Sequence, residues 1–397
     1  MLTISNKGRL MPESPIRKLV PYAEKAKKNG VKVFHLNIGQ PDIETPFSAI
    51  EAVKNSNIKV LAYSKSEGDY ELRNKICDYY SKINIKIDES QVIVTSGASE
   101  ALLFTIGSIM DPGDEIIIPE PFYANYNGFS VANGVNIVPI FSSIDNNFEL
   151  PKIQEFENLI SSNTKAILIC NPNNPTGYVY SYDEIKTLVE IVKKHNLFLI
   201  ADEVYREFTY DNVSHTSILQ FDDIKQHAIV IDSVSKRYSM CGARIGCIIS
   251  KNSEFISTAM KFAQARLSPP TLAQIASTAA METGEDYFNK VINEYNDRRK
   301  TLVEGLNEIP GVKVSEPKGA FYCVVELPVN NSEHFAKWLL EEYSLNQETI
   351  MVAPAAGFYS TPNIGQNQVR IAYVLNQSDL KSCINILKNG LMEYLKQ

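Results

Sequence analysis

The sequence predicts an α/β protein with a mostly parallel sheet covered by helices, followed by a smaller α+β module. From about residue 90 to 250, short apolar blocks alternate with segments of helical spacing, which is typical of a parallel sheet between helical layers. From about residue 285 the pattern changes to a long charged helix, 285–308, and then to strand-like blocks at 311–314 and 321–326. At 397 residues and 44% hydrophobic content, the chain can bury a large core and should form more than one domain.

Seven blocks rich in branched apolar residues are the expected strands. They lie at 91–95, 114–119, 135–138, 166–170, 197–201, 228–232 and 245–249. Apolar residues recur at helical spacing from Tyr182 to His195, between two of these blocks, and an apolar helix is expected from Ala101 to Met110. No repeat, low-complexity tract or flexible linker interrupts the pattern.

Polar side chains follow three of these strands at the point where each strand ends. The turn 171–177 follows one strand, Asp202 and Tyr205 follow the next, and Ser233 and Lys236 follow the third. Ligands of open parallel sheets bind in the crevice outside the carboxyl ends of the strands. Most lysines are solvated, so Lys236 alone indicates little. The three strand ends together predict a pocket in which a buried lysine amine serves as a nucleophile.

A phosphate site is predicted between the first strand of the series and the helix after it. The backbone N–H groups of Ala98 and Ser99 would point from a helix N-terminus towards an anion, and Ser99 could equally be a plain N-cap. A charged side chain and two hydroxyl groups would complete this phosphate-binding cradle. They are expected from Ser233, Ser235 and Arg244.

Composition excludes several classes of function. A net charge of −7 argues against a nucleic-acid partner. The N-terminus lacks the apolar core of a signal peptide and no apolar run would span a bilayer, so we expect a cytoplasmic protein without a membrane partner. The six cysteines form no Cys-x-x-Cys pair, which favours reduced thiols, and the five histidines show no metal-ligand spacing, so no metal is expected. No Gly-x-Gly-x-x-Gly opens a helix after the first strand, which argues against a nicotinamide enzyme.

The motifs, in their order and spacing, resemble those of class I and II aminotransferases of the aspartate aminotransferase superfamily, which use pyridoxal 5′-phosphate. The resemblance covers nearly the whole chain. It rests on segments 36–42, 63–73, 96–100, 171–177, 202–205, 233–244, 319–322 and 369–371. It implies the type I fold of these enzymes: a large cofactor-binding domain, 46–295, with a mostly parallel seven-stranded sheet, and a small α+β domain built from 1–45 and 296–397.

The resemblance also implies a role for each polar group. Lys236 would form a Schiff base with the cofactor aldehyde and act as general base, while Asp202 would hold the pyridine nitrogen protonated so that the ring can accept electrons. Tyr205 and Asn174 would donate hydrogen bonds to the cofactor phenolate, and Tyr123 would stack on its ring. Taken singly, these residues have ordinary alternatives: a turn or N-cap acid, packed tyrosines and a turn asparagine.

Substrate and subunit contacts follow from the same resemblance. Arg370 would grip the substrate α-carboxylate as a bidentate fork, with Gly39 allowing close backbone approach. Tyr63 would reach the phosphate from the neighbouring subunit, which predicts a homodimer with shared active sites. Arg266 would supply the cation for a distal carboxylate across the dimer, or would be a plain surface arginine of a helix.

The sequence departs from the family pattern at three positions near this site. Some bacterial aspartate-specific relatives carry a lysine where this chain has Ser99. Cys241 and Ala243 replace a common threonine and tryptophan, which leaves less bulk beside the phosphate cradle.

We therefore expect an aminotransferase that moves an amino group from an L-amino acid to a 2-oxo acid in two ping-pong half-reactions, with aspartate and glutamate as first substrates. The alternatives on the same scaffold are an aromatic or alanine aminotransferase and a carbon–sulfur β-lyase. A metabolite-sensing regulator is the non-enzyme alternative. It would carry a DNA-binding extension, and only about forty residues without a helix-turn-helix pattern precede the early glycine loop.

Overall fold

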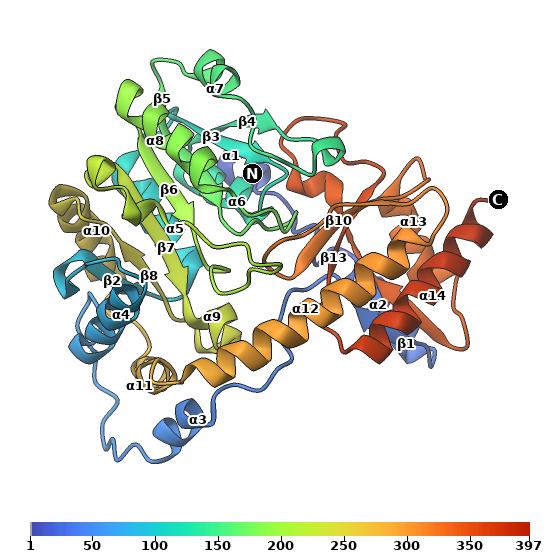
Figure 1. The fold of residues 1–397 in the computed structure, drawn as a ribbon, viewed down its shortest axis with the longest axis horizontal. Helices are drawn as coiled ribbons and strands as arrows, with labels where there is room; N and C mark the ends of the chain where they lie inside the picture. The colour runs from blue at the N-terminus through green and yellow to red at the C-terminus, as the bar shows by residue number, and fades with distance from the viewer. Residues whose placement is uncertain (1) are drawn as a thin grey trace.

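The computed structural model describes residues 2–397 and contains the predicted seven-stranded sheet (Figure 1). Its strand order is β2-β8-β7-β6-β5-β3-β4, and all neighbours are parallel except β8, which runs antiparallel to β2 and β7. The strands are β2 (Val92–Thr95), β3 (Glu115–Glu120), β4 (Asn136–Phe141), β5 (Thr164–Cys170), β6 (Phe198–Asp202), β7 (Ala228–Ser233) and β8 (Gly246–Ile249). Each lies within a few residues of a predicted block, so the α/β prediction is confirmed.

Helices cover both faces of this sheet, because alternate residues of each buried strand point to opposite sides. Ile116, Leu168 and Ile200 pack with α5 and α10 on one face. Ile117 and Ile167 pack with α4 and α8 on the other. The helices of this part are α4 (Tyr70–Lys82), α5 (Ala98–Ile109), α6 (Asn125–Asn133), α7 (Ile153–Leu159), α8 (Tyr182–His195), α9 (Val234–Arg237), α10 (Ser253–Arg266) and α11 (Thr271–Ala280).

The α+β module joins residues from both ends of the chain. Its antiparallel sheet has the order β12-β13-β10-β9, and β1 pairs in parallel with β11 in a separate two-stranded sheet. These strands are β1 (Lys32–His35), β9 (Lys313–Val314), β10 (Tyr322–Glu326), β11 (Glu348–Met351), β12 (Ala353–Pro354) and β13 (Gln368–Ala372). The helices beside them are α2 (Val20–Lys28), α13 (Ser332–Glu341) and α14 (Gln377–Tyr394).

A single long helix, α12 (Glu285–Asn307), connects the two parts (Figure 1). The predicted domain boundary at 295/296 falls inside this helix. The chain ahead of the large sheet adds α1 (Asn6–Leu10) and α3 (Phe47–Lys54), and α3 with the loop after it extends from the lower edge of the molecule.

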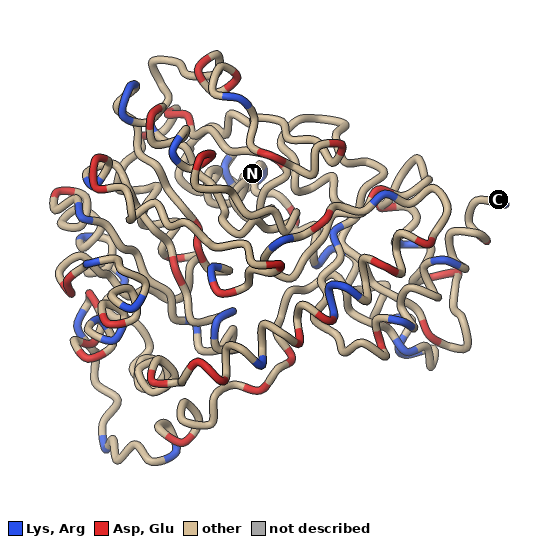
Figure 2. Tube along the Cα trace, viewed as in Figure 1, with Lys and Arg blue, Asp and Glu red and all other residues tan. Residues whose placement is uncertain are grey.

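Acidic and basic residues are mixed along the whole fold, and α12 carries both signs (Figure 2). Of the helices within residues 2–397, none combines the length and the apolar character needed to cross a bilayer.

Candidate active site

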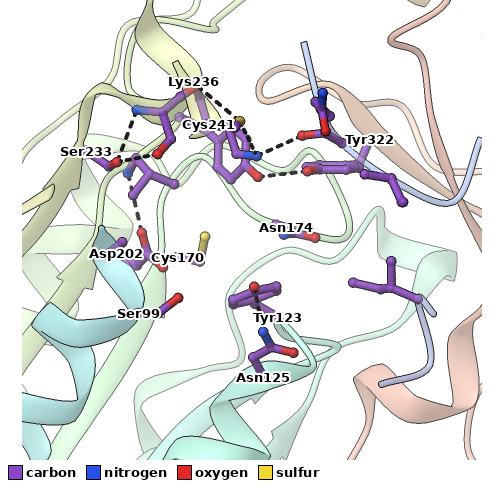
Figure 3. Close-up of a pocket in the computed structure, with 18 of the residues that line it drawn as sticks. Ser99, Tyr123, Asn125, Cys170, Asn174, Asp202, Ser233, Lys236, Cys241 and Tyr322 are labelled. Carbon is purple, nitrogen blue, oxygen red and sulfur yellow. Dashed lines mark hydrogen bonds between the residues drawn. The ribbon is translucent and has the colours of Figure 1, made fainter. Parts of the chain in front are cut away.

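A cavity of about 660 Å³ opens where the carboxyl ends of the large-sheet strands meet the α+β module. Twelve of the fourteen predicted site residues line it: Gly39, Ala98, Ser99, Tyr123, Asn174, Asp202, Tyr205, Ser233, Ser235, Lys236, Arg244 and Arg370. Figure 3 shows Lys236, Ser99, Tyr123 and Tyr322 arranged around one common space. The predicted convergence of three strand ends is therefore observed.

Lys236 lies in the short helix α9, just after β7, and its side chain is half-buried. Its Nζ donates a hydrogen bond to the Gly39 carbonyl at 2.7 Å and lies 3.5 Å from the Cys241 Sγ. The Tyr205 and Phe321 rings lie 6.0 Å away, measured from Nζ to each centroid. The amine is thus held at the junction of both parts of the chain.

Asp202 is the last residue of β6 and is 4% exposed. The Tyr126 hydroxyl donates to its Oδ2 at 2.8 Å. Burial raises the pKa of the Asp202 carboxyl to about 6, although the hydrogen bonds from Tyr126 and the Val204 amide lower it. The alternatives of an N-cap or a solvated turn acid are wrong, because the side chain is buried and no helix begins there.

The phenol of Tyr205 also has a partner that the sequence did not indicate. Its Oη lies 2.8 Å from the Tyr322 Oη, and both rings are buried. Tyr322 also crowds Gly39, where an added Cβ would lie 1.7 Å from the Tyr322 Oη. The Tyr322 side chain therefore leaves no room for any residue but glycine at position 39. The approach of a substrate to Gly39 stays a prediction.

Arg370 lies on β13, in the module opposite the large sheet, and is 1% exposed. Its Nη1 donates to the Asn174 Oδ1 at 3.0 Å, and Nη2 donates to the Asn37 carbonyl. The Nε is buried without a partner among residues 2–397. The guanidinium is therefore oriented by the protein and has hydrogen-bonding capacity left for a ligand.

The residues that were predicted to bind a phosphate come together at the start of α5. Gly97 is the N-cap residue, with φ +81°, so the alternative of Ser99 as N-cap is wrong. The amides of Ala98 and Ser99 have no acceptor within residues 2–397. An added Cβ at Gly97 would lie 2.4 Å from the Arg244 Nη2, so glycine leaves room for the guanidinium beside the helix end.

Ser233 and Ser235 complete this side of the pocket. Their hydroxyl oxygens lie 2.8 Å apart, and the Ser233 hydroxyl also donates to the Ile245 carbonyl at 2.7 Å. These contacts fix the chain immediately before Lys236.

Two predicted residues lie away from the pocket of their own chain. Tyr63 is 80% exposed in the loop after α3. Arg266 is half-buried and pairs with Glu100, with 2.8 Å between Nη1 and Oε2, and its Nη2 donates to the Ser66 carbonyl at 2.9 Å. Arg266 is thus neither a free cation nor a plain surface residue. Its role across a dimer stays a prediction, and these contacts weigh against it.

The residues fit a phosphorylated pyridine aldehyde. The free amides at the start of α5 suit a phosphate, the buried Asp202 suits a ring nitrogen that carries a proton, and Lys236 suits an aldehyde. Within residues 2–397, no cluster of three or more His, Cys, Asp or Glu side chains is arranged to hold a metal ion.

The fold and this pocket define an aminotransferase. The model of the family described as aminotransferase class I and II matches residues 31–387, so the chain belongs to this pyridoxal 5′-phosphate-dependent family. An aspartate aminotransferase of Pyrococcus horikoshii is 32% identical over 394 residues, which cover 98% of this chain and 97% of that protein.

Solved structures agree with the family assignment. A single mutant of Thermus thermophilus aspartate aminotransferase superposes with a TM-score of 0.90 at 26% identity, covering 98% of this chain and 100% of that one. An alanine aminotransferase from Pyrococcus furiosus has the same TM-score and the same coverage at 28% identity.

Proposed function

We propose that this chain binds pyridoxal 5′-phosphate through Lys236 and transfers the amino group of a dicarboxylic L-amino acid, aspartate or glutamate, to a 2-oxo acid. The observation that carries the proposal is the single cavity that contains Lys236, Asp202, Arg244 and Arg370. Its substrate part is also supported by the aspartate aminotransferases among the relatives.

Each end of the cofactor has a matching group in this cavity. The Ala98 and Ser99 amides, together with Arg244, would hold the phosphate at the N-terminus of α5. Asp202 would accept a hydrogen bond from the ring nitrogen, and Tyr126 keeps this carboxylate in place. When bound, the cofactor supplies an aldehyde that takes up the amino group and a ring that withdraws electrons from the α-carbon.

The remaining chemistry belongs to the protein. Arg370 would hold the α-carboxylate, which turns the α-hydrogen towards the Lys236 amine. That amine would take the proton from the α-carbon and deliver it to the carbon of the cofactor that carried the aldehyde. The Tyr205 hydroxyl would donate a hydrogen bond to the phenolate oxygen of the cofactor. This is the same hydroxyl that contacts the Tyr322 hydroxyl in the structure.

We also propose a cytoplasmic homodimer. Large apolar side chains on and near the α3 arm are more than half exposed, which is typical of an interaction surface. They include Phe47, Val60, Leu61, Tyr63 and Leu267. A second copy that covers them would bring Tyr63 close to a phosphate cradle. All six cysteines are free, which suits a reducing compartment.

The proposal is tested by borohydride reduction and peptide mapping, followed by half-reactions with a panel of amino acids. The reduced cofactor should be attached to Lys236, and it should be lost in Lys236→Ala but retained in the matched variant Lys251→Ala, which lies outside the pocket. Aspartate or glutamate should convert the bound cofactor to pyridoxamine 5′-phosphate. An adduct at another lysine would overturn the assignment of Lys236, and release of pyruvate and ammonia would indicate the β-lyase instead.

A further inference from the structure

Arg17 is a third arginine of the catalytic cavity, and nothing above gives it a role. It lies in the turn between α1 and α2 and lines the cavity together with Ser14 and Ile16. Its side chain is exposed and makes no hydrogen bond or ion pair with any of residues 2–397. The guanidinium is therefore available to a ligand at the opening of the cavity.

The backbone that carries Arg17 is firmly held on both sides. The Asn37 Nδ2 donates to the Ile16 carbonyl at 2.7 Å, and the Arg17 amide donates to the Ser14 carbonyl at 3.0 Å. The next residue, Lys18, forms an ion pair with Glu333 of α13. The turn thus presents Arg17 from the α+β module, the part of the protein that also carries Arg370.

The charges of Arg17 and Arg370 both influence Tyr123, which lines the same cavity. Burial raises the pKa of the Tyr123 hydroxyl to about 12, and the positive charges of Arg370 and Arg17 both oppose this rise. Both guanidinium groups therefore act on the Tyr123 side of the cavity. Arg244 lies elsewhere, against the Cys241 and Ser96 carbonyls.

Among the charged residues that line the cavity, Arg17 has no anionic group to pair with. Among the residues that line it, the cations are Arg17, Lys236, Arg244 and Arg370, and the only carboxylate is Asp202. The proposed function places a phosphate at Arg244, an α-carboxylate at Arg370 and the cofactor aldehyde at Lys236. A substrate with a second carboxylate would supply the anion that Arg17 lacks.

We propose that Arg17 binds the distal carboxylate of dicarboxylic substrates and so determines the preference of this enzyme for acidic amino acids. This inference rests on the proposed function. It replaces Arg266, whose guanidinium is already bound to Glu100. A planar guanidinium suits a carboxylate because two parallel hydrogen bonds can form. Arg370 would hold one end of the substrate and Arg17 the other, with the reacting carbon between them.

The test compares Arg17→Gln with the matched control Lys28→Gln, which removes an exposed charge of α2 that does not line the cavity. In the holoenzyme, kcat/KM for glutamate and aspartate should fall at least about tenfold in Arg17→Gln, the order expected for a charge-assisted pair at a partly exposed site. Alanine and phenylalanine should be unaffected, and so should all substrates in Lys28→Gln. A second readout is the dissociation constant of maleate, a dicarboxylate, against propionate, a monocarboxylate. Only maleate should bind more weakly to Arg17→Gln.

The outcomes separate this inference from the proposed function. If the wild-type enzyme converts no amino acid to its 2-oxo acid, the proposed function fails. If it does, but Arg17→Gln weakens acidic and neutral substrates equally or leaves maleate binding unchanged, the role of Arg17 is refuted and the aminotransferase remains. A selective loss for acidic substrates in Arg266→Gln, with Arg17→Gln unaffected, would also refute it.

Discussion

Replacing Asp202 with asparagine should stabilise the apoprotein at high pH. The pKa of the buried Asp202 carboxyl is about 6 in the folded chain, against an ordinary value of 3.8. A raised pKa means that folding favours the protonated form. The stability contributed by that form is complete below about pH 4 and is lost as the pH rises through about 6. Asparagine stays neutral and keeps an acceptor for the Tyr126 hydroxyl, so its contribution does not change with pH.

The expected magnitude follows from the difference between the two pKa values, which is about 2. One pKa unit corresponds to about 1.4 kcal/mol, so full ionisation of Asp202 costs about 3 kcal/mol of folding free energy. Asp202 is fully buried, so solvent screening does not reduce this figure much. Asp232 adds to the effect and Lys236 opposes it, since both charges influence the same carboxyl.

The measurement is urea unfolding of the cofactor-free protein at pH 5 and pH 8. The unfolding free energy of Asp202→Asn, relative to wild type, should rise by about 1.4 kcal/mol between these two pH values, because about half of the total change already occurs below pH 5. Glu308→Gln is the matched control, because the Glu308 side chain is exposed and bonds to no other group within residues 2–397. An advantage of Asp202→Asn that is equal at both pH values would show that its ionisation is not the cause.

Two further predictions concern a buried ion pair and the subunit contact. Arg237 donates to both carboxylate oxygens of Asp232, at 2.8 and 2.7 Å, and both side chains are at most 3% exposed. Arg237→Met should therefore lower the unfolding free energy by about 3–5 kcal/mol in urea titrations, and a loss below about 1 kcal/mol would contradict the pairing. Because Tyr63 is 80% exposed in its own chain, heterodimers of wild type with the double variant Tyr63→Ala, Arg244→Ala should have both sites impaired if sites are shared. One fully active site per heterodimer would rule sharing out.

Local patterns predicted the strands and the residues that follow them. Branched apolar blocks, turns and caps act over a few residues, and the carboxyl ends of parallel strands must share one edge. Asp202 and Lys236 could therefore be assigned to one pocket, although 34 residues separate them in the sequence. The helix from Tyr182 to His195 was predicted at its observed bounds from its apolar spacing alone.

Contacts between distant segments could not be predicted in this way. Tyr126 meets Asp202 across 76 residues, and Tyr322 meets Tyr205 across 117. Both pairs depend on how α6 and the α+β module pack against the large sheet, for which no short-range pattern exists. Arg17 was missed for the same reason: its sequence neighbourhood resembles any charged turn, and only the fold brings it to the cavity.

The charge balance of the cavity links ligand binding to stability. Four cations and one carboxylate line the space between the two parts of the chain, so like charges repel one another there when no anion is bound. On the proposed function, a phosphate dianion at α5 and a substrate carboxylate at Arg370 would remove much of this repulsion, and both would bind the folded chain far better than the unfolded one. The cofactor should thus stabilise the fold by mass action, and the substrate should add to this by bringing the α+β module and the large sheet together around one pair of anions. In this protein, the groups proposed to recognise the reactants line the space between its two structural parts.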